Sequence, residues 1–335
     1  ELLVGSCNPS VSAQDLIGQA GSFADNLRKE VDVQKGTEHI SKVLNDLGTQ
    51  VEETMRNKAE GKVLRVPTGF YTLDYLTYGG FNCGNLVILA ARPSVGKTAV
   101  MLQMARAAAT VGKTVNIYSL EMTNTELAQR FLYATEHITP GQMASADVDW
   151  QSFEVASAQY ASKPIYLSDS LFAEDEIIAN ITLNNQSGKC DIVFIDYLGL
   201  VMYANSKELL SNQIASFTKR LKKVAKACKI PIVLLCQLNR SSASEKRPPQ
   251  LYDLRDSGSI EQDADIVLML ERASDNEDAR DVNMWVRKNR QGKAGEIKIE
   301  IEGNETFTAF RDKNEPPPPP LPEWDSNFEN DNLPF

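Results

Sequence analysis

One string of eight residues constrains the fold of this chain more than any other feature. Residues 91–98 read Ala-Arg-Pro-Ser-Val-Gly-Lys-Thr; they begin at the last residue of the apolar run Leu86–Ala91 and precede the helix-favouring run Ala99–Ala109. A buried strand, a loop and a helix start in this order match a phosphate-binding loop, except that Ala91 replaces the first glycine. In such a loop, backbone N–H groups and the helix N-terminus converge on phosphate. The alternative is a chance Gly-Lys-Thr helix start without a ligand.

The same loop indicates which residues hold a nucleotide and a metal ion. Lys97 is expected to reach the β and γ phosphates, and Thr98 to offer its hydroxyl to Mg²⁺. The expected nucleotide-binding residues are Ala91, Arg92, Pro93, Ser94, Val95, Gly96, Lys97 and Thr98. ATP and Mg²⁺ are therefore the expected ligands.

Short apolar runs alternate with helical segments from residue 67 onward, which predicts an α/β fold with a mainly parallel central sheet. The expected strands of that sheet are Leu86–Ala91, Val115–Leu120, Ile165–Ser168, Ile192–Asp196, Ile232–Gln237 and Ile266–Leu270. Three later runs lie close together and predict an antiparallel extension: Val282–Lys288, Glu296–Ile301 and Phe307–Arg311.

Three polar residues stand at the ends of expected strands. Asp196 follows four apolar residues at a strand's carboxyl end, so it is the expected second ligand of Mg²⁺. Glu121 is the candidate for positioning or deprotonating an attacking water, or alternatively a glutamate in the N-cap region of a helix over 124–134. Gln237 is the candidate sensor of the γ phosphate, or alternatively a polar strand terminus.

Composition and charge narrow the class of protein. The net charge is −10, but residues 314–335 hold five acidic residues and no basic one, so the charge does not exclude a nucleic-acid partner. The basic run Lys219–Lys229 is expected to be a solvated outer helix face. The longest apolar runs have five or six residues, which is too short for a membrane helix of ~18. Five scattered cysteines without a CxxC pair indicate reduced thiols and a cytoplasmic location.

Five strings point to a family. In chain order, ARPSVGKT, SLEM, IDYLGLV, QLNR and LRDSGSIEQDADIV resemble the ATPase domain of DnaB-type hexameric replicative helicases, over roughly residues 38–312. The resemblance implies a RecA-like ATPase core preceded by a helical linker. It also implies Glu121 as catalytic glutamate, Asp196 as metal ligand and Gln237 as sensor. Arg130 matches an arginine at the family's nucleotide site; its alternative role is that of an exposed helical arginine.

Two further cations gain a role from the resemblance. Lys288 and Arg290 lie two residues apart at a strand end, so their side chains share a face. They resemble the family's lysine and arginine finger, which enters the nucleotide site of the next subunit. The alternative is two surface cations beside a turn that contains Gly292.

The segment around Arg255 is expected to bind DNA. In similar helicases this segment lines the central channel and holds the single-stranded backbone, and Arg255, Asp256 and Gly258 are the matching residues. Asp256 stands where relatives usually carry glutamate. Ser259 and Gln262 have the spacing of a capping box, which predicts a helix that starts after Ser259.

By this resemblance the chain is an ATP-dependent replicative DNA helicase, a ring that translocates 5′ to 3′ on single-stranded DNA and unwinds duplex at the replication fork. A homo-oligomer, with a hexamer expected, and partners such as primase and a helicase loader are implied. One alternative is a recombination or repair ATPase of the RecA/RadA kind. Another is a ring or scaffold that binds nucleotide without catalysis.

The resemblance also suggests a division of the chain. An amphipathic pattern predicts a helix over 38–57, which packs either on its own domain or on a neighbouring subunit. The expected parts are 1–37, a remnant of an N-terminal helical domain; 38–66, linker helix and connector; 67–312, the RecA-like ATPase domain; and 313–335, a disordered, proline-rich acidic tail.

The last residues of the tail resemble a docking tag. Leu333, Pro334 and Phe335 follow acidic residues, as at the tip of bacterial single-stranded-DNA-binding proteins. The resemblance implies that a partner of those proteins also binds this tip. The alternative is a solubilising tail with a chance Pro-Phe end.

Overall fold

The computed structural model describes residues 37–202, 209–239, 247–254, 257–274 and 280–316. Contacts within the chain divide it into two units, residues 1–64 and 65–335. In the first unit lies α3 (Ile40–Ala59), which agrees within two residues with the expected helix over 38–57. Its apolar positions are all exposed: Ile40, Val43, Leu44, Leu47, Val51 and Met55.

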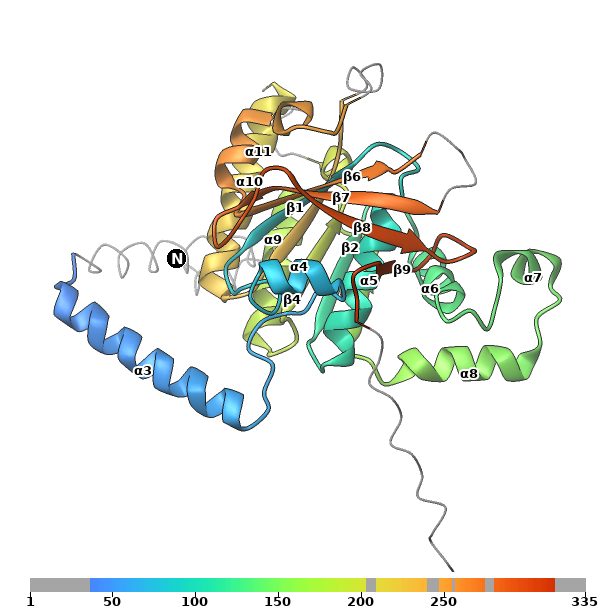
Figure 1. Ribbon diagram of the computed structural model, residues 1–335, viewed down its shortest axis with the longest axis horizontal. Coiled ribbons are helices and arrows are strands. Elements are labelled where there is room, and N and C mark those ends of the chain that lie inside the picture. Colours follow the sequence, from blue (N-terminus) through green and yellow to red (C-terminus); the bar gives the residue numbers. More distant parts are fainter. Residues whose placement is uncertain (1–36, 203–208, 240–246, 255–256, 275–279, 317–335) are drawn as a thin grey trace, which may run out of the picture. The chain divides into compact units, whose positions relative to one another are not determined.

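The second unit is built on one sheet of nine strands, ordered β3-β2-β4-β5-β1-β6-β7-β8-β9 (Figure 1). The strands are β1 (Leu86–Ala91), β2 (Val115–Ser119), β3 (Ile165–Ser168), β4 (Ile192–Asp196), β5 (Ile232–Gln237), β6 (Ile266–Arg272), β7 (Asp281–Asn289), β8 (Ile297–Gly303) and β9 (Phe310–Asp312). The first six strands pair in parallel and the last three extend the sheet in antiparallel fashion. Both expectations about the sheet are therefore confirmed.

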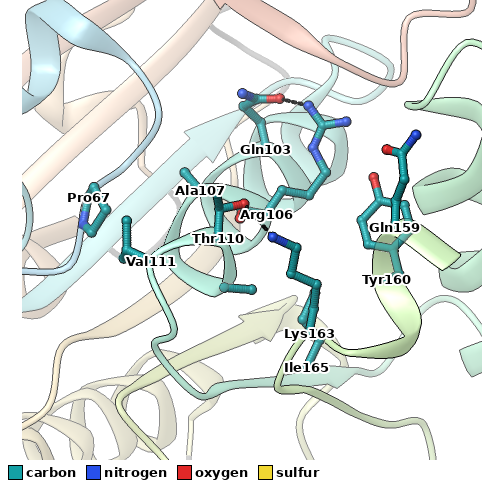
Figure 2. Close-up of a pocket in the computed structure, with 11 residues that line it drawn as sticks. Pro67, Gln103, Arg106, Ala107, Thr110, Val111, Gln159, Tyr160, Lys163 and Ile165 are labelled. Carbon is teal, nitrogen blue, oxygen red and sulfur yellow. Dashed lines mark hydrogen bonds between the residues drawn. The ribbon is translucent and has the colours of Figure 1, made fainter. Parts of the chain in front are cut away.

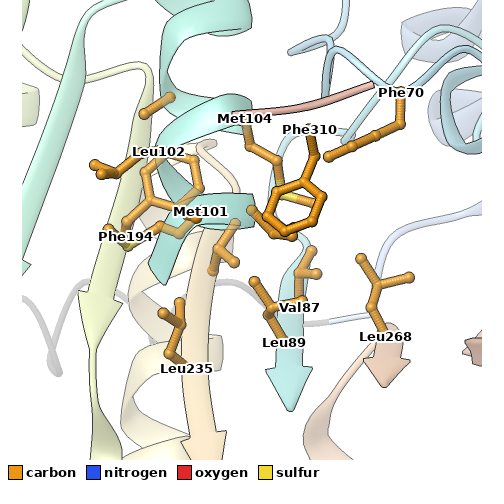
Figure 3. Close-up of a cluster of buried hydrophobic side chains, with 14 of the residues drawn as sticks. Phe70, Val87, Leu89, Met101, Leu102, Met104, Phe194, Leu235, Leu268 and Phe310 are labelled. Carbon is orange, nitrogen blue, oxygen red and sulfur yellow. The ribbon is translucent and has the colours of Figure 1, made fainter. Parts of the chain in front are cut away.

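Apolar residues on both sides of β1 explain the layers. Val87 and Leu89 face a core that includes α5 (Figure 3). Leu86 and Ile88 face a second core under α10, as expected for a strand covered on both faces. The helices of this unit are α4 (Tyr71–Leu76), α5 (Lys97–Thr110), α6 (Asn124–Tyr133), α7 (Pro140–Ser145), α8 (Trp150–Ala161), α9 (Glu174–Gln186), α10 (Leu210–Cys228) and α11 (Ser257–Asp263).

The last strand is shorter than the expected run Phe307–Arg311. Residues before Phe310 form a turn, because the Asn304 side chain accepts hydrogen bonds from the N–H groups of Thr308 and Ala309. Phe307 has a φ of +55°, outside the strand region. The apolar pattern therefore placed the start of the strand too early.

None of the helices in the described part of the chain combines the length and apolarity that a membrane span requires.

Candidate nucleotide site

The phosphate loop joins β1 to α5, and its conformation depends on Gly96. Gly96 has a φ of +97° and directly precedes Lys97, the first residue of α5. A Cβ atom at this position would lie 2.9 Å from ring carbons of Phe307 and Phe310. Glycine is therefore required both by the left-handed backbone and by the two aromatic rings behind the loop.

Asp196 ends β4 beside this loop, with 1% of the residue exposed. The Thr98 hydroxyl donates to its Oδ2 atom at 2.7 Å, and the Lys97 ammonium lies 3.9 Å from Oδ1. Among the described residues, Oδ1 has no hydrogen-bond donor. Burial raises the pKa of the Asp196 carboxyl, while Lys97, the Thr98 hydrogen bond and Arg130 act in the opposite direction.

A buried carboxylate oxygen without a donor, next to a threonine hydroxyl, fits a hard divalent cation. Mg²⁺ binds oxygen ligands and takes only one or two from the protein, the rest being phosphate and water oxygens. Thr98 and Asp196 therefore suit Mg²⁺ bound together with a nucleotide.

Two more expected residues lie at the same edge of the sheet. Ser119 of β2 pairs with Asp196, so Glu121, two residues further on, leaves the sheet at the same end with an exposed side chain. Gln237 ends β5 and pairs with Ala91, where the phosphate loop begins. The carboxyl ends of four neighbouring strands thus bring these residues around the loop, the usual ligand position in such sheets.

The alternative role of Glu121 in starting a helix is filled by other residues. Thr123 is the N-cap of α6, and Glu126 completes a reciprocal capping box with it. Glu121 lies outside that box. Arg130 lies in the last turn of α6, and its charge acts to lower the pKa of the Asp196 carboxyl. Its role at the nucleotide site stays a prediction.

Sequence reasoning missed one aromatic contact of the site. The Lys97 ammonium lies 4.6 Å from the ring centroid of Tyr197, which directly follows Asp196. Cations are attracted to the face of an aromatic ring. Tyr197 therefore helps to position Lys97. Its position directly after the strand-ending Asp196 was the feature of the sequence that could have indicated this contact.

Lys288 and Arg290 both lie away from the loop-bearing end of the sheet, Arg290 further than Lys288. Lys288 pairs with Val267, which pairs with Ile88, so Lys288 lies level with the middle of β1. Because β7 runs antiparallel to β6, Arg290 lies still further from the loop-bearing end. Three residues of strand separate Ile88 from Ala91, about 10 Å along the strand, before the distance across the sheet is counted.

The two cations share a face, as expected, and both contact the end of α11. The Lys288 ammonium donates to the Glu261 carbonyl. The Arg290 guanidinium donates to the Gln262 carbonyl at 2.5 Å and lies 3.5 Å from Asp265. Burial, together with the neighbouring charge of Arg290, lowers the pKa of Lys288.

The DNA-binding candidates are only partly described. Arg255 and Asp256 lie outside the described residues, as do Leu333, Pro334 and Phe335 in the tail. Gly258 lies within α11, which begins at Ser257. The expected capping box at Ser259 is wrong, because Ser259 is already inside the helix and cannot be its N-cap.

The basic run 219–229 is not simply a solvated face. Lys222 of α10 donates to the Gly84 carbonyl at 2.7 Å and forms an ion pair with Asp265. Its side chain is only 14% exposed. Asp265 also accepts the N–H of Leu86, so Lys222 helps to fix the start of β1.

A cavity of about 770 Å³ lies beside the later turns of α5, away from Lys97 (Figure 2). Gln103, Arg106 and Thr110 of α5 face Tyr160 and Lys163 across it. Lys163 donates to the Thr110 hydroxyl at 3.2 Å. Thr110 is thirteen residues after Lys97, or about 20 Å along the helix, so this cavity is separate from the phosphate loop.

Comparisons with known proteins agree with the geometry. Residues 65–312 match the DnaB-like helicase C-terminal domain family. A replicative DNA helicase DnaB of Leifsonia xyli subsp. xyli is 32% identical over 317 residues, which are 88% of this chain and 67% of that protein. Across several such relatives, the chain spans half to two thirds of the relative's length.

Solved structures agree as well. A structure described as an ATPase domain matches with a TM-score of 0.73 and 30% identity, over 82% of this chain and 99% of that domain. A DnaB-like replicative helicase, described with its interactions with primase, matches with a TM-score of 0.70 and 29% identity, over 90% of this chain and 77% of that one. The RecA-like fold is therefore confirmed, and the chain belongs to the DnaB-like helicase C-terminal domain family.

Proposed function

We propose that the chain is the motor of an ATP-dependent replicative DNA helicase that moves 5′ to 3′ on single-stranded DNA. The observation that carries the proposal is the group of Lys97, Thr98 and Asp196 at one edge of the sheet, with a buried carboxylate oxygen left for a metal ion. The replicative helicases among its relatives favour this function over the RecA/RadA alternative.

The residues around the loop divide the chemistry of ATP hydrolysis. Lys97 binds phosphate oxygens, and Thr98 and Asp196 hold Mg²⁺, which neutralises charge that develops on the phosphates. Glu121 positions the attacking water and accepts its proton. Gln237, one strand from the loop, senses the γ phosphate, and Arg130 adds positive charge.

Lys288 and Arg290 complete the site of another copy. Lys288 lies level with the middle of β1 and Arg290 lies further from the phosphate loop, which favours a role for both at the nucleotide of another copy. A head-to-tail contact between copies brings the two edges together, and repetition of such a contact closes a ring when the rotation allows it. A hexamer is the expected ring, and the exposed apolar stripe of α3 packs on a neighbouring copy.

DNA passes through the ring along the segment 255–258. Arg255, Asp256 and Gly258 hold the phosphate backbone without reading bases, as a motor that moves along any sequence requires. Primase is a further proposed partner, because one matching structure is described with its primase interactions. A helicase loader and a partner that binds the acidic tip at Phe335 remain predictions from the resemblance.

Strand separation tests the proposal directly. The full chain with ATP and Mg²⁺ is expected to unwind a fork with a free 5′ tail, to leave a duplex with only a 3′ tail intact, and to hydrolyse ATP faster when single-stranded DNA is present. Lys97→Ala is the control without nucleotide binding. Filaments that exchange strands would favour the recombinase alternative, and nucleotide binding without turnover would favour a scaffold.

A further inference from the structure

Three exposed tyrosines form a groove on the second unit that the proposed function does not use. Tyr71 is 50%, Tyr75 75% and Tyr78 69% exposed, and they line a groove of about 560 Å³ together with Leu76 and Lys293. Tyr71 and Tyr75 are four residues apart on α4, so they lie on one helix face. Exposed aromatic side chains gathered in this way mark a surface that binds something.

The base of the groove is held firmly. Leu73 of α4 is fully buried, and the Asp74 carboxylate accepts hydrogen bonds at 2.8 Å from both the N–H and the hydroxyl of Thr68. After the helix, the Gly79 N–H donates to the Asp74 carbonyl at 2.7 Å. The tyrosines are therefore presented from a fixed support, so an occupant would bind a preformed surface.

The described chain ends beside this groove. Asp312, the last residue of β9, accepts the N–H of Thr72 on α4 at 2.6 Å, and Figure 1 shows α4 next to β9. The Glu315 N–H donates to the Asp312 carbonyl at 3.1 Å, which keeps the following residues close by. Pro316 therefore leaves the folded body at the start of α4.

The sequence after Glu315 has the chemistry that tyrosine grooves bind. Residues 316–322 read Pro-Pro-Pro-Pro-Pro-Leu-Pro. Such a run adopts the polyproline II conformation of ~3.1 Å per residue, so seven residues reach about 20 Å, more than the roughly 9 Å of α4. Proline-rich segments of this kind dock in aromatic grooves, because little conformational entropy remains to be lost.

Charge favours the same occupant. The residues that follow the prolines include Glu323 and Asp325, and Lys293 lies at the groove. We propose that residues 316–322 dock on the groove of Tyr71, Tyr75 and Tyr78 in the same chain. The acidic end of the tail then starts from a fixed point on the body.

Trp324, two residues after Pro322, reports on this contact. We would label the full chain with 5-fluorotryptophan and record ¹⁹F NMR spectra, with the three tryptophan lines assigned by single Trp→Phe substitutions. A docked tail makes Trp324 tumble with the folded body, which broadens its line. Tyr75→Ser is expected to narrow that line, and so is replacement of residues 317–320 by serine, which leaves the folded body unchanged.

Tyr166→Ser is the matched control. Tyr166 is 48% exposed and lies on β3, at the other end of the nine-stranded sheet from β9. This substitution is expected to leave the Trp324 line broad. A narrow line in the unaltered chain, or a broad line that survives both Tyr75→Ser and the serine replacement, would overturn the proposal.

Mixing separates docking within a chain from docking between copies. Labelled Tyr75→Ser chains are combined with an excess of unlabelled, unaltered chains and allowed to reassemble. The Trp324 line is expected to stay narrow, because each unaltered groove holds its own tail. A line that becomes broad in the mixture would assign the contact to another copy and contradict the proposal.

Discussion

The two edges of the central sheet carry polar residues of different kinds. At the carboxyl edge, Thr98 and Lys97 surround a carboxylate of Asp196 that is 1% exposed and retains an oxygen without a donor. Toward the amino edge, Arg290 is 49% exposed and lies 3.5 Å from Asp265. The first group is buried, whereas the Arg290 guanidinium is half exposed, although it also donates to the Gln262 carbonyl.

In the proposed function, this difference divides the residues of ATP hydrolysis between two copies of the chain. Burying a carboxylate costs free energy unless a cation or hydrogen-bond donors bind it. In the proposed function, the metal ion that binds the Asp196 carboxylate belongs to the nucleotide site of the same chain. The Arg290 side chain is 49% exposed, and in the proposed function it exchanges its contacts with Gln262 and Asp265 for a phosphate of another copy. In the proposed function, the chain carries both halves of a catalytic site, which meet only between copies.

The largest effect is expected from the substitution of Arg290, the half-exposed residue of the comparison. Arg290→Ala should lower the ATP turnover number by about 10³–10⁵-fold, since arginine fingers stabilise charge that develops only in the transition state. Nucleotide affinity, measured by titration of a fluorescent ATP analogue, should change little. Arg311→Ala removes an exposed arginine from β9 and is the control with normal turnover. Equal losses in both variants would contradict a finger role.

The next effect concerns the chemistry at the buried half. Glu121→Gln should lower turnover by about 10²–10⁴-fold through loss of the general base, while nucleotide binding stays near normal. Lys97→Ala, in contrast, should remove binding itself. Glu154→Gln, an exposed glutamate on α8, is the matched control. If Glu121→Gln weakened binding as much as Lys97→Ala, Glu121 would be a phosphate-site residue and not the base.

A smaller effect sharpens the account of the loop. Gly96→Ala places a Cβ atom 2.9 Å from two phenylalanine rings and forces alanine to a φ of +97°. We expect a loss of about 1–3 kcal/mol in the free energy of unfolding, measured by urea denaturation, because strained positions of this kind cost that much. Phe307→Ala combined with Gly96→Ala should recover part of the loss. No recovery would mean that the backbone and the Phe310 ring require glycine without help from Phe307.

Substitutions in α3 should change assembly without changing the residues of the nucleotide site or Arg290. Leu44→Ser with Leu47→Ser removes apolar side chains from the exposed stripe and should shift rings toward smaller species by light scattering. Asp46→Ser with Glu53→Ser changes the opposite helix face and is the control. Assembly that survives the leucine changes would mean that α3 packs on its own chain.

Much of the sheet could be predicted because buried parallel strands consist of short apolar runs with visible ends. Asp196 and Gln237 close β4 and β5 as expected, and Glu121 follows β2 two residues past its end. Strand ends set the register of these residues, so their place beside the phosphate loop could be predicted, while their chemical roles stay predictions. The contact of Tyr197 with Lys97 was missed because it depends on the directions in which the two side chains point in the folded chain.

Features that depend on long-range contacts could not be predicted. Lys222 is half of a buried ion pair only because Asp265, far along the chain, directly precedes strand β6. Ser259 has capping-box spacing, but α11 starts at Ser257. The pair Lys288 and Arg290 was expected at a strand end, yet only the antiparallel direction of β7 places it away from its own phosphate loop.

A mixing experiment tests most directly whether one site is shared by two copies. Lys97→Ala chains lack a working phosphate loop and Arg290→Ala chains lack a finger, so each is expected to be nearly inactive alone. In mixed rings, about a quarter of the interfaces should combine an intact loop with an intact finger from the next copy. ATP turnover should therefore recover to a substantial fraction of the unaltered level. Mixed rings, verified by mass, that show no recovery would contradict the shared site.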